Sequence, residues 1–181
     1  NVQNLTATVN DLKAILGNIY GDNGINKTLP EALKDFTITL TAGELFSVFL
    51  NATAAQISYM KSIDFVNDYR AASNVIDTLN KTGNHIDING TNLFYLVSSL
   101  TADQAARFRG GIADIITHFN DLKGVISAFN TALGANPVGG IINISDADIF
   151  RLFVTLTDDK INYLKGATVA GDFAAIRTTL N

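Results

Sequence analysis

The chain contains an internal repeat. Three segments align without a gap over more than twenty residues when Phe46, Phe94 and Phe150 are superimposed. Each of these residues follows a Leu or Ile, and each is followed at the seventh place by Thr and at the fifteenth by Lys or Arg. A unit of about fifty residues cannot bury its own apolar face, so such units stack and share a core. This periodicity restricts the fold more than any other feature of the chain.

Two helix starts recur in every repeat. At each start, a side chain that can cap the helix is followed three places later by one that is expected to reach back to the cap. The predicted caps of the first helices are Thr41, Asn89 and Ser145, and those of the second helices are Thr53, Thr101 and Thr157.

A longer third helix and an extended segment complete each unit. Apolar spacing predicts third helices over about 64–80 and 114–130, and a shorter one over 170–181. Residues 10–13 repeat residues 120–123, so the chain is expected to open inside such a helix. Before each first helix, apolar residues alternate with polar ones, which predicts an extended stretch; the pairs are Ile38 and Leu40, Ile86 and Ile88, and Ile142 and Ile144.

These patterns predict a mainly α fold of tandem three-helix repeats with short extended segments between them, either an open solenoid or a closed helical bundle derived from repeats. We expect a single repeat domain over residues 1–181, divided into 1–20, the final helix of a preceding repeat, and repeats at 36–80, 85–130 and 141–181. The longest connection runs from Gly21 to Asp35, where Pro30 before Glu31 predicts one extra helical turn.

Composition excludes several classes of protein. Apolar residues make up 47% of the chain and charged residues 17%, which is typical of an ordered, well-packed protein. With 13 Lys and Arg and a net charge of -4, the chain offers no basic field for nucleic acid. It has no Cys, and no stretch suited to a membrane span or a targeting sequence.

No motif points to catalysis or to a cofactor. His85 and His118 stand at non-equivalent positions without a ligand partner at helical spacing, which favours a structural role. Residues 87–92 alternate oxygen-bearing side chains around a glycine, but they lack the glycine and glutamate positions of a calcium loop, and capping explains them. No serine elbow or phosphate loop is present. We therefore expect no enzyme, no metal and no cofactor.

One cation recurs near the end of each second helix: Lys61, Arg109 and Lys165. Each can compensate the negative end of its helix. Alternatively, the three form a ladder along one face that binds an anionic polysaccharide or an acidic partner.

Both ends of the repeat array carry apolar residues that a self-contained solenoid would not expose. The candidate assembly residues are Leu12, Ile15, Phe173, Ile176 and Leu180. They predict head-to-tail self-association that can propagate into filaments. The extended segments are expected to add open strand edges.

The leading hypothesis is a non-enzymatic structural or interaction module of an extracellular or cell-surface repeat protein, whose partner is itself, another surface protein or an anionic polysaccharide. Six Asn-x-Ser/Thr sequons, at Asn4, Asn26, Asn51, Asn80, Asn89 and Asn143, are compatible with export. The alternative is a helical carrier of an apolar small molecule such as a lipid, because the first helices are rich in Phe.

Overall fold

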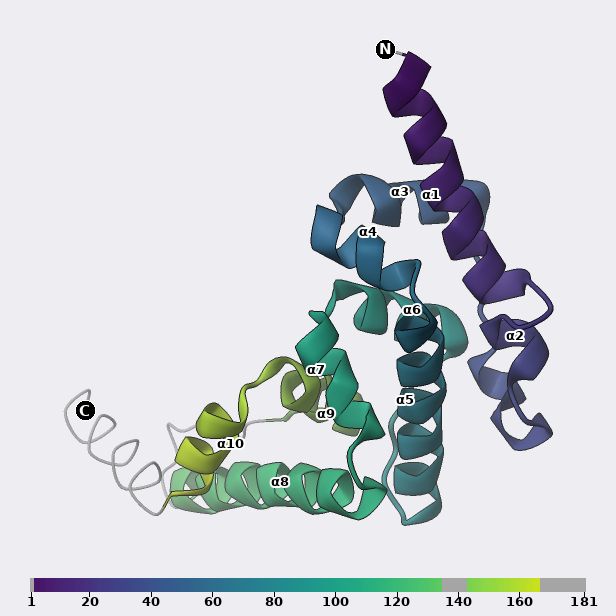
Figure 1. Ribbon diagram of the computed structural model, residues 1–181. Helices are drawn as coiled ribbons and strands as arrows, with labels where there is room; N and C mark the ends of the chain where they lie inside the picture. Colours follow the sequence, from purple (N-terminus) through teal and green to yellow (C-terminus); the bar gives the residue numbers. More distant parts are fainter. Residues whose placement is uncertain (1, 135–142, 167–181) are drawn as a thin grey trace. The chain divides into compact units, whose positions relative to one another are not determined.

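The computed structural model of the protein describes residues 2–134 and 143–166. Over these residues the chain is mainly helical and contains no β-strand (Figure 1). It divides into two compact units, Asn1–Ile112 and Ala113–Asn181.

Unit 1 is built around one long central helix, α5. The elements of this unit are α1 (Val2–Tyr20), α2 (Ile25–Thr28), the 3-10 helix η1 (Glu31–Phe36), α3 (Ala42–Asn51), α4 (Ala54–Met60), α5 (Ile63–Lys81), α6 (Gly90–Ser99), α7 (Ala102–Ala106) and the 3-10 helix η2 (Arg107–Arg109). The central helix contacts α1, α2, η1, α4, α6, α7 and η2. Its apolar face is buried along its whole length, from Phe65 to Leu79. The core of unit 1 therefore lies around α5.

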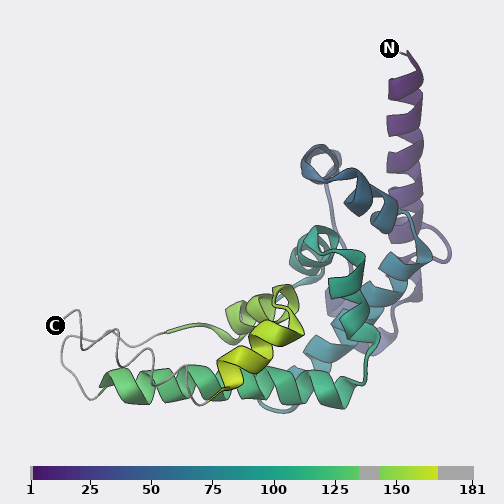
Figure 2. The same ribbon diagram turned by 60° about the vertical axis from the view of Figure 1, so that its left-hand side comes forward.

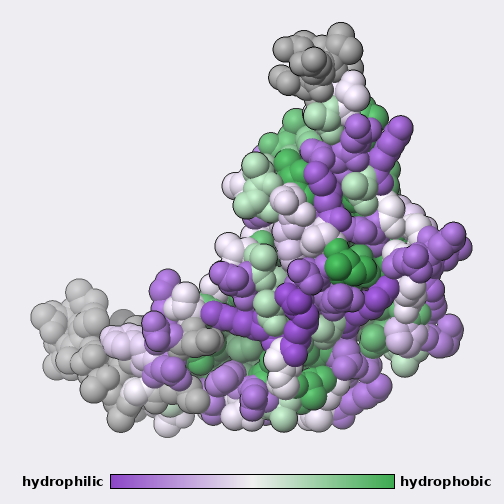
Figure 3. Space-filling view, viewed as in Figure 1, coloured by the Kyte–Doolittle hydropathy of each residue, from purple (hydrophilic) through white to green (hydrophobic). Residues whose placement is uncertain are grey.

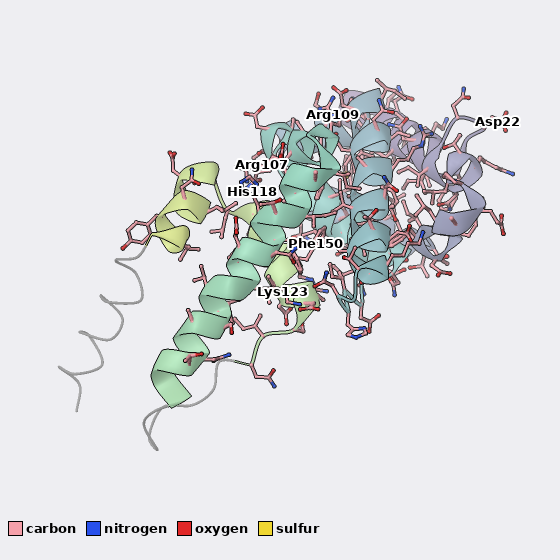
Figure 4. The ribbon with its side chains drawn as sticks, turned by 90° about the horizontal axis from the view of Figure 1, so that it is seen from below. Asp22, Arg107, Arg109, His118, Lys123 and Phe150 are labelled. Atoms are coloured by element: carbon pink, nitrogen blue, oxygen red, sulfur yellow. The ribbon has the colours of Figure 1, made fainter. Side chains whose placement is uncertain are left out.

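Unit 2 contains α8 (Ile112–Gly134), α9 (Asp146–Thr155) and α10 (Asp158–Lys165). Phe119 of α8 and Phe150 of α9 are both fully buried, and their ring centroids lie 6.5 Å apart. Lys123 and Asp146 form an ion pair of 2.8 Å between the same two helices. Figure 4 shows the Phe150 and Lys123 side chains between the two helices.

The predicted helix starts are confirmed. All six predicted caps are N-caps whose side chain accepts a backbone N–H three residues later. At Thr41, Thr53 and Thr101 the later side chain also bonds back to the cap, which completes a capping box. The extra turn after Pro30 is present as η1.

The expected open strand edges are wrong for the two described extended segments. The side-chain oxygen of Asn26 accepts from the Ile38 N–H at 2.8 Å, and its amide donates to the Ile38 carbonyl at 2.7 Å. Asn80 makes the same pair of bonds to Ile86, at 2.8 and 3.2 Å. We call these pairs the asparagine clamps. They occupy backbone groups that a neighbouring strand would need for pairing. Ile142, in the third extended segment, lies outside the described residues.

The segment after η1 is fixed from a second side. The buried Tyr69 hydroxyl of α5 lies 2.7 Å from the Phe36 carbonyl and 2.8 Å from the Gly90 carbonyl, and it donates its proton to this pair. A Cβ at Gly90 would come within 2.2 Å of the Thr37 carbonyl oxygen. Only glycine therefore lets the start of α6 approach the end of η1 this closely.

Candidate functional site

Two of the three repeated cations form ion pairs within unit 1. Lys61 follows the last residue of α4, and its Nζ lies 2.5 Å from Oδ1 of Asp11 on α1. Arg109 ends η2 next to α5, as Figure 4 shows, and its Nη1 lies 3.1 Å from Oδ1 of Asp64. Lys165 is the last residue of α10, and its side chain lies outside the described part. Lys61 and Arg109 are thus each already paired with a carboxylate of a neighbouring helix.

Arg109 also contacts the fully buried carboxylate of Asp68. The Arg109 Nε lies 2.6 Å from one Asp68 oxygen, and the Tyr59 hydroxyl donates to the other at 2.9 Å. Burial raises the pKa of Asp68 above its ordinary value, opposed by the hydrogen bond from Tyr59 and the charge of Arg109. Burial also raises the pKa of Tyr59, together with the bond to Asp68.

A carboxyl group with a raised pKa is a common feature of catalytic sites. Asp68, however, has an exposed fraction of 0%, so a substrate cannot reach it. The Tyr59 ring meets Phe65 edge-on at 5.5 Å, which closes the cluster from the apolar side. The cluster holds α4, α5 and η2 together. Sequence analysis missed it because Asp68 carries a charge on the buried face of a helix.

A second candidate site is an apolar groove between α1 and α3. It has a volume of about 470 Å³ and is lined by Leu12, Leu16, Tyr20, Leu40, Thr41, Ala42, Leu45 and Phe46. We call it the α1–α3 groove. No charged side chain lines it. The Leu40 N–H donates to the Tyr20 hydroxyl at 3.2 Å, which joins the end of α1 to the segment before α3. Figure 3 shows hydrophobic surface over α3.

The groove is open because the first repeat lacks an aromatic ring that the other two possess. Phe94 is fully buried against Phe65 of α5, with ring centroids 5.8 Å apart. Phe150 is fully buried beside Phe119 of α8. Phe46, which aligns with both, is 47% exposed.

The helix that lacks the aromatic ring is α1. Its residues that align with Phe65 and Phe119 are Leu5 and Val9, neither of which is aromatic. Val9 is 40% exposed. In two views, the amino-terminal turns of α1 extend beyond the other helices of unit 1 (Figures 1 and 2). The absence of an aromatic residue at both aligned positions is the sequence signal that marks this groove.

The candidate assembly residues have different surroundings. Leu12 lines the α1–α3 groove, whereas Ile15 lies on the fully buried face of α1 and is unavailable to a partner. Phe173, Ile176 and Leu180 lie outside the described residues.

The described ranges were also compared with the requirements of a metal site and of a membrane span. No group of three metal-ligating side chains occurs there. No helix of the described part is long and apolar enough to cross a membrane.

Comparison with known proteins gave no match: no family model, no curated protein and no solved structure is significantly similar to this chain.

Proposed function

We propose that the protein is a non-enzymatic interaction module built from tandem three-helix repeats, and that it self-associates through the α1–α3 groove. The observation that carries the proposal is the half-exposed Phe46 at a position where the other two repeats bury the same residue. Soluble proteins rarely leave a contiguous apolar surface of this kind without a partner.

The proposed occupant is residues 170–181 of a second copy. Large apolar side chains of α1 and α3 line the groove, and no charged side chain does, so a helix with an apolar face complements it. The sequence places Phe173, Ile176 and Leu180 at the spacing of one helical face. The contact joins two different surfaces of the protein. It therefore propagates into a filament unless the rotation between successive copies closes a ring.

We place this module in an extracellular or cell-surface protein. The six sequons are compatible with that location, and filament growth or adhesion through repeated contacts suits it. The partner is a second copy, and another surface protein or an anionic polysaccharide is the next candidate.

Sedimentation velocity over a concentration series tests self-association with a matched pair of variants. Leu16 lines the groove, whereas Leu152 belongs to α9 of unit 2 and is not among the lining residues; both are 39% exposed. We expect Leu16→Ser to weaken association at least about tenfold, because burying one leucine contributes about 1.5 kcal/mol or more. Leu152→Ser should leave association unchanged.

Ile176→Asp tests the other side of the contact. It should weaken association as Leu16→Ser does, and the double variant should lose little more than either single one, since both remove the same contact. A wild-type protein that stays monomeric at every concentration, or equal effects of Leu16→Ser and Leu152→Ser, would overturn the proposal.

The same groove supports a second candidate function, the carrier of an apolar small molecule. A volume of about 470 Å³ falls in the range of small-molecule sites, and the lining is almost wholly apolar. Native mass spectrometry of freshly purified protein separates the two functions. A bound mass of a few hundred daltons, lost in Leu16→Ser, would favour the carrier, and a ladder of oligomers would favour assembly.

A further inference from the structure

In unit 1 the segment that carries α2 and η1 packs against α5 (Figure 1). A second hollow lies between them. It has a volume of about 770 Å³. One wall is formed by Asn23, Thr28, Pro30 and Leu33, and the other by Ile63, Arg70, Ala71 and Asn74. We call it the Arg70 groove.

Arg70 brings a positive charge to this groove, and no carboxylate in the described part of the chain pairs with it. Its Nη2 donates to the Asn23 carbonyl at 3.2 Å and to the Thr28 hydroxyl. Its Nε is buried and has no acceptor. Within the described residues Arg70 forms no ion pair, in contrast to Lys61 and Arg109. Neutral oxygens compensate a half-buried guanidinium less well than an anion does.

Apolar surface lies beside this charge. Leu33 and Pro30 form part of one wall, and Ile63, the first residue of α5, is 62% exposed at the other. A hollow with an apolar wall and one well-placed charged group has the character of a small-molecule site. The planar guanidinium of arginine is the side chain best matched to a carboxylate.

Arg70 and the insert that forms the facing wall both differ from the equivalent positions of the other repeats. Arg70 aligns with Asn10 on α1 and Asn120 on α8, so the repeat does not require a cation there. The insert from Gly21 to Asp35 is longer than the connection at the next junction, Lys81 to Asn84. Arg70 joins this insert to α5 through hydrogen bonds to Asn23 and Thr28, and it has no counter-ion among residues 2–134 and 143–166.

We propose that the Arg70 groove binds a small carboxylic acid with an apolar body. The carboxylate pairs with the Arg70 guanidinium, and the apolar body lies against Leu33 and Ile63. The site is separate from the α1–α3 groove and does not depend on self-association.

The test uses N-acetyl-L-phenylalanine as the acid and its uncharged amide as the control. Both are titrated into the ¹⁵N-labelled full chain while backbone amide shifts are recorded. We expect saturable shifts confined to residues 23–33 and 63–74, with the amide binding at least about tenfold more weakly because it lacks the charge that Arg70 recognises. Equal binding of acid and amide, or no saturable shift at millimolar acid, would overturn the proposal.

Three variants complete the design. Arg70→Gln should abolish the preference for the acid, whereas Arg151→Gln, which removes an arginine paired with Asp148, should leave it unchanged. Because Arg70→Gln also loosens the insert, Asn74→Trp serves as an independent variant that fills the groove and keeps Arg70. Asn74→Trp should abolish binding of both probes. Wild-type affinity for the acid in Arg70→Gln or Asn74→Trp would contradict the proposal.

Discussion

Asp68 is the residue at which charge and burial conflict most strongly in this protein. Its carboxylate has no exposed surface, and among the residues that the structure describes Arg109 and the Tyr59 hydroxyl compensate it. Removing one partner of such a group leaves a buried charge without compensation, which costs far more than losing an exposed ion pair. Arg109 and Lys61 align in the repeat but are therefore expected to differ in their contribution to stability.

Urea denaturation at neutral pH can measure this difference. Arg109→Met should lower the free energy of unfolding by about 1–3 kcal/mol, because Asp68 stays buried and loses its cation. Lys61→Met should cost less than about 1 kcal/mol, since its pair with Asp11 is partly exposed. Equal losses at the two sites would show that the Asp68 contact contributes nothing of its own.

Glu44 makes stability depend on pH in a defined direction. The Thr41 backbone N–H and then its hydroxyl donate to the Glu44 carboxylate, and these bonds lower its pKa below the ordinary 4.5. A carboxyl group with a lowered folded pKa stabilises the fold above its unfolded pKa, and this contribution is lost as the pH falls through the folded value.

The prediction is that wild type loses more stability than Glu44→Gln between about pH 6 and pH 3. Glutamine keeps the acceptor for Thr41 and removes the titration, so it isolates the charge. Thermal unfolding at closely spaced pH values is the measurement. Parallel pH profiles for the two proteins would contradict a role for the Glu44 carboxylate.

At the scale of elements, the caps determine where the short helices begin. Thr101 takes part in a complete capping box with Gln104, whereas Thr157 accepts from the Lys160 N–H at 3.4 Å without reciprocation. We expect Thr101→Ala and Thr157→Ala to cost about 1 kcal/mol each, with the larger loss at Thr101.

Paired urea denaturation curves test the caps, with Thr→Ser at the same sites as controls that keep the hydroxyl. The serine variants should retain most of the stability that the alanine variants lose. No loss in either alanine variant would mean that the caps do not stabilise these helices.

The sequence predicted helix starts well because a cap is a local signal, read from residues three places apart. It placed the extended segments before α3 and α6 correctly but predicted open strand edges there wrongly, because side chains bond to their backbone. Asn26 lies twelve residues before Ile38, and nothing in the alternation of apolar and polar residues reveals which group will bond to it. The sequence indicates the α1–α3 groove only in part: of the predicted assembly residues Leu12 lines it and Ile15 is buried, while Phe46 supports only the carrier hypothesis, as one of the Phe residues of the first helices. The groove is open because α1 lacks an aromatic ring at the positions of Phe65 and Phe119. The alignment of the third helices shows that absence but does not show that a groove results from it.

At the scale of the whole molecule, each unit has its own core, and unit 1 leaves part of its apolar surface exposed along α1 and α3. Val9 stands where Tyr69 and Phe119 stand in the other third helices. Val9→Phe should place a ring over Phe46, raise the free energy of unfolding by up to about 1 kcal/mol and weaken self-association.

Denaturation and sedimentation on the same Val9→Phe sample test both effects. Val9→Ala provides the opposite change in size and should not protect Phe46. Association that persists unchanged in a stabilised Val9→Phe protein would separate the groove from assembly.

The asparagine clamps have a consequence for the exchange of backbone hydrogens with solvent. Amides outside helices and strands usually exchange quickly because opening their hydrogen bonds requires little energy. The Ile38 and Ile86 amides lie in such segments, yet each is bonded to a side-chain oxygen at 2.8 Å and belongs to a buried residue. To expose either amide, the asparagine must leave and the isoleucine must rise out of the core. These two hydrogens should therefore remain for as long as those of the surrounding helices, so that the linking segments unfold together with the core.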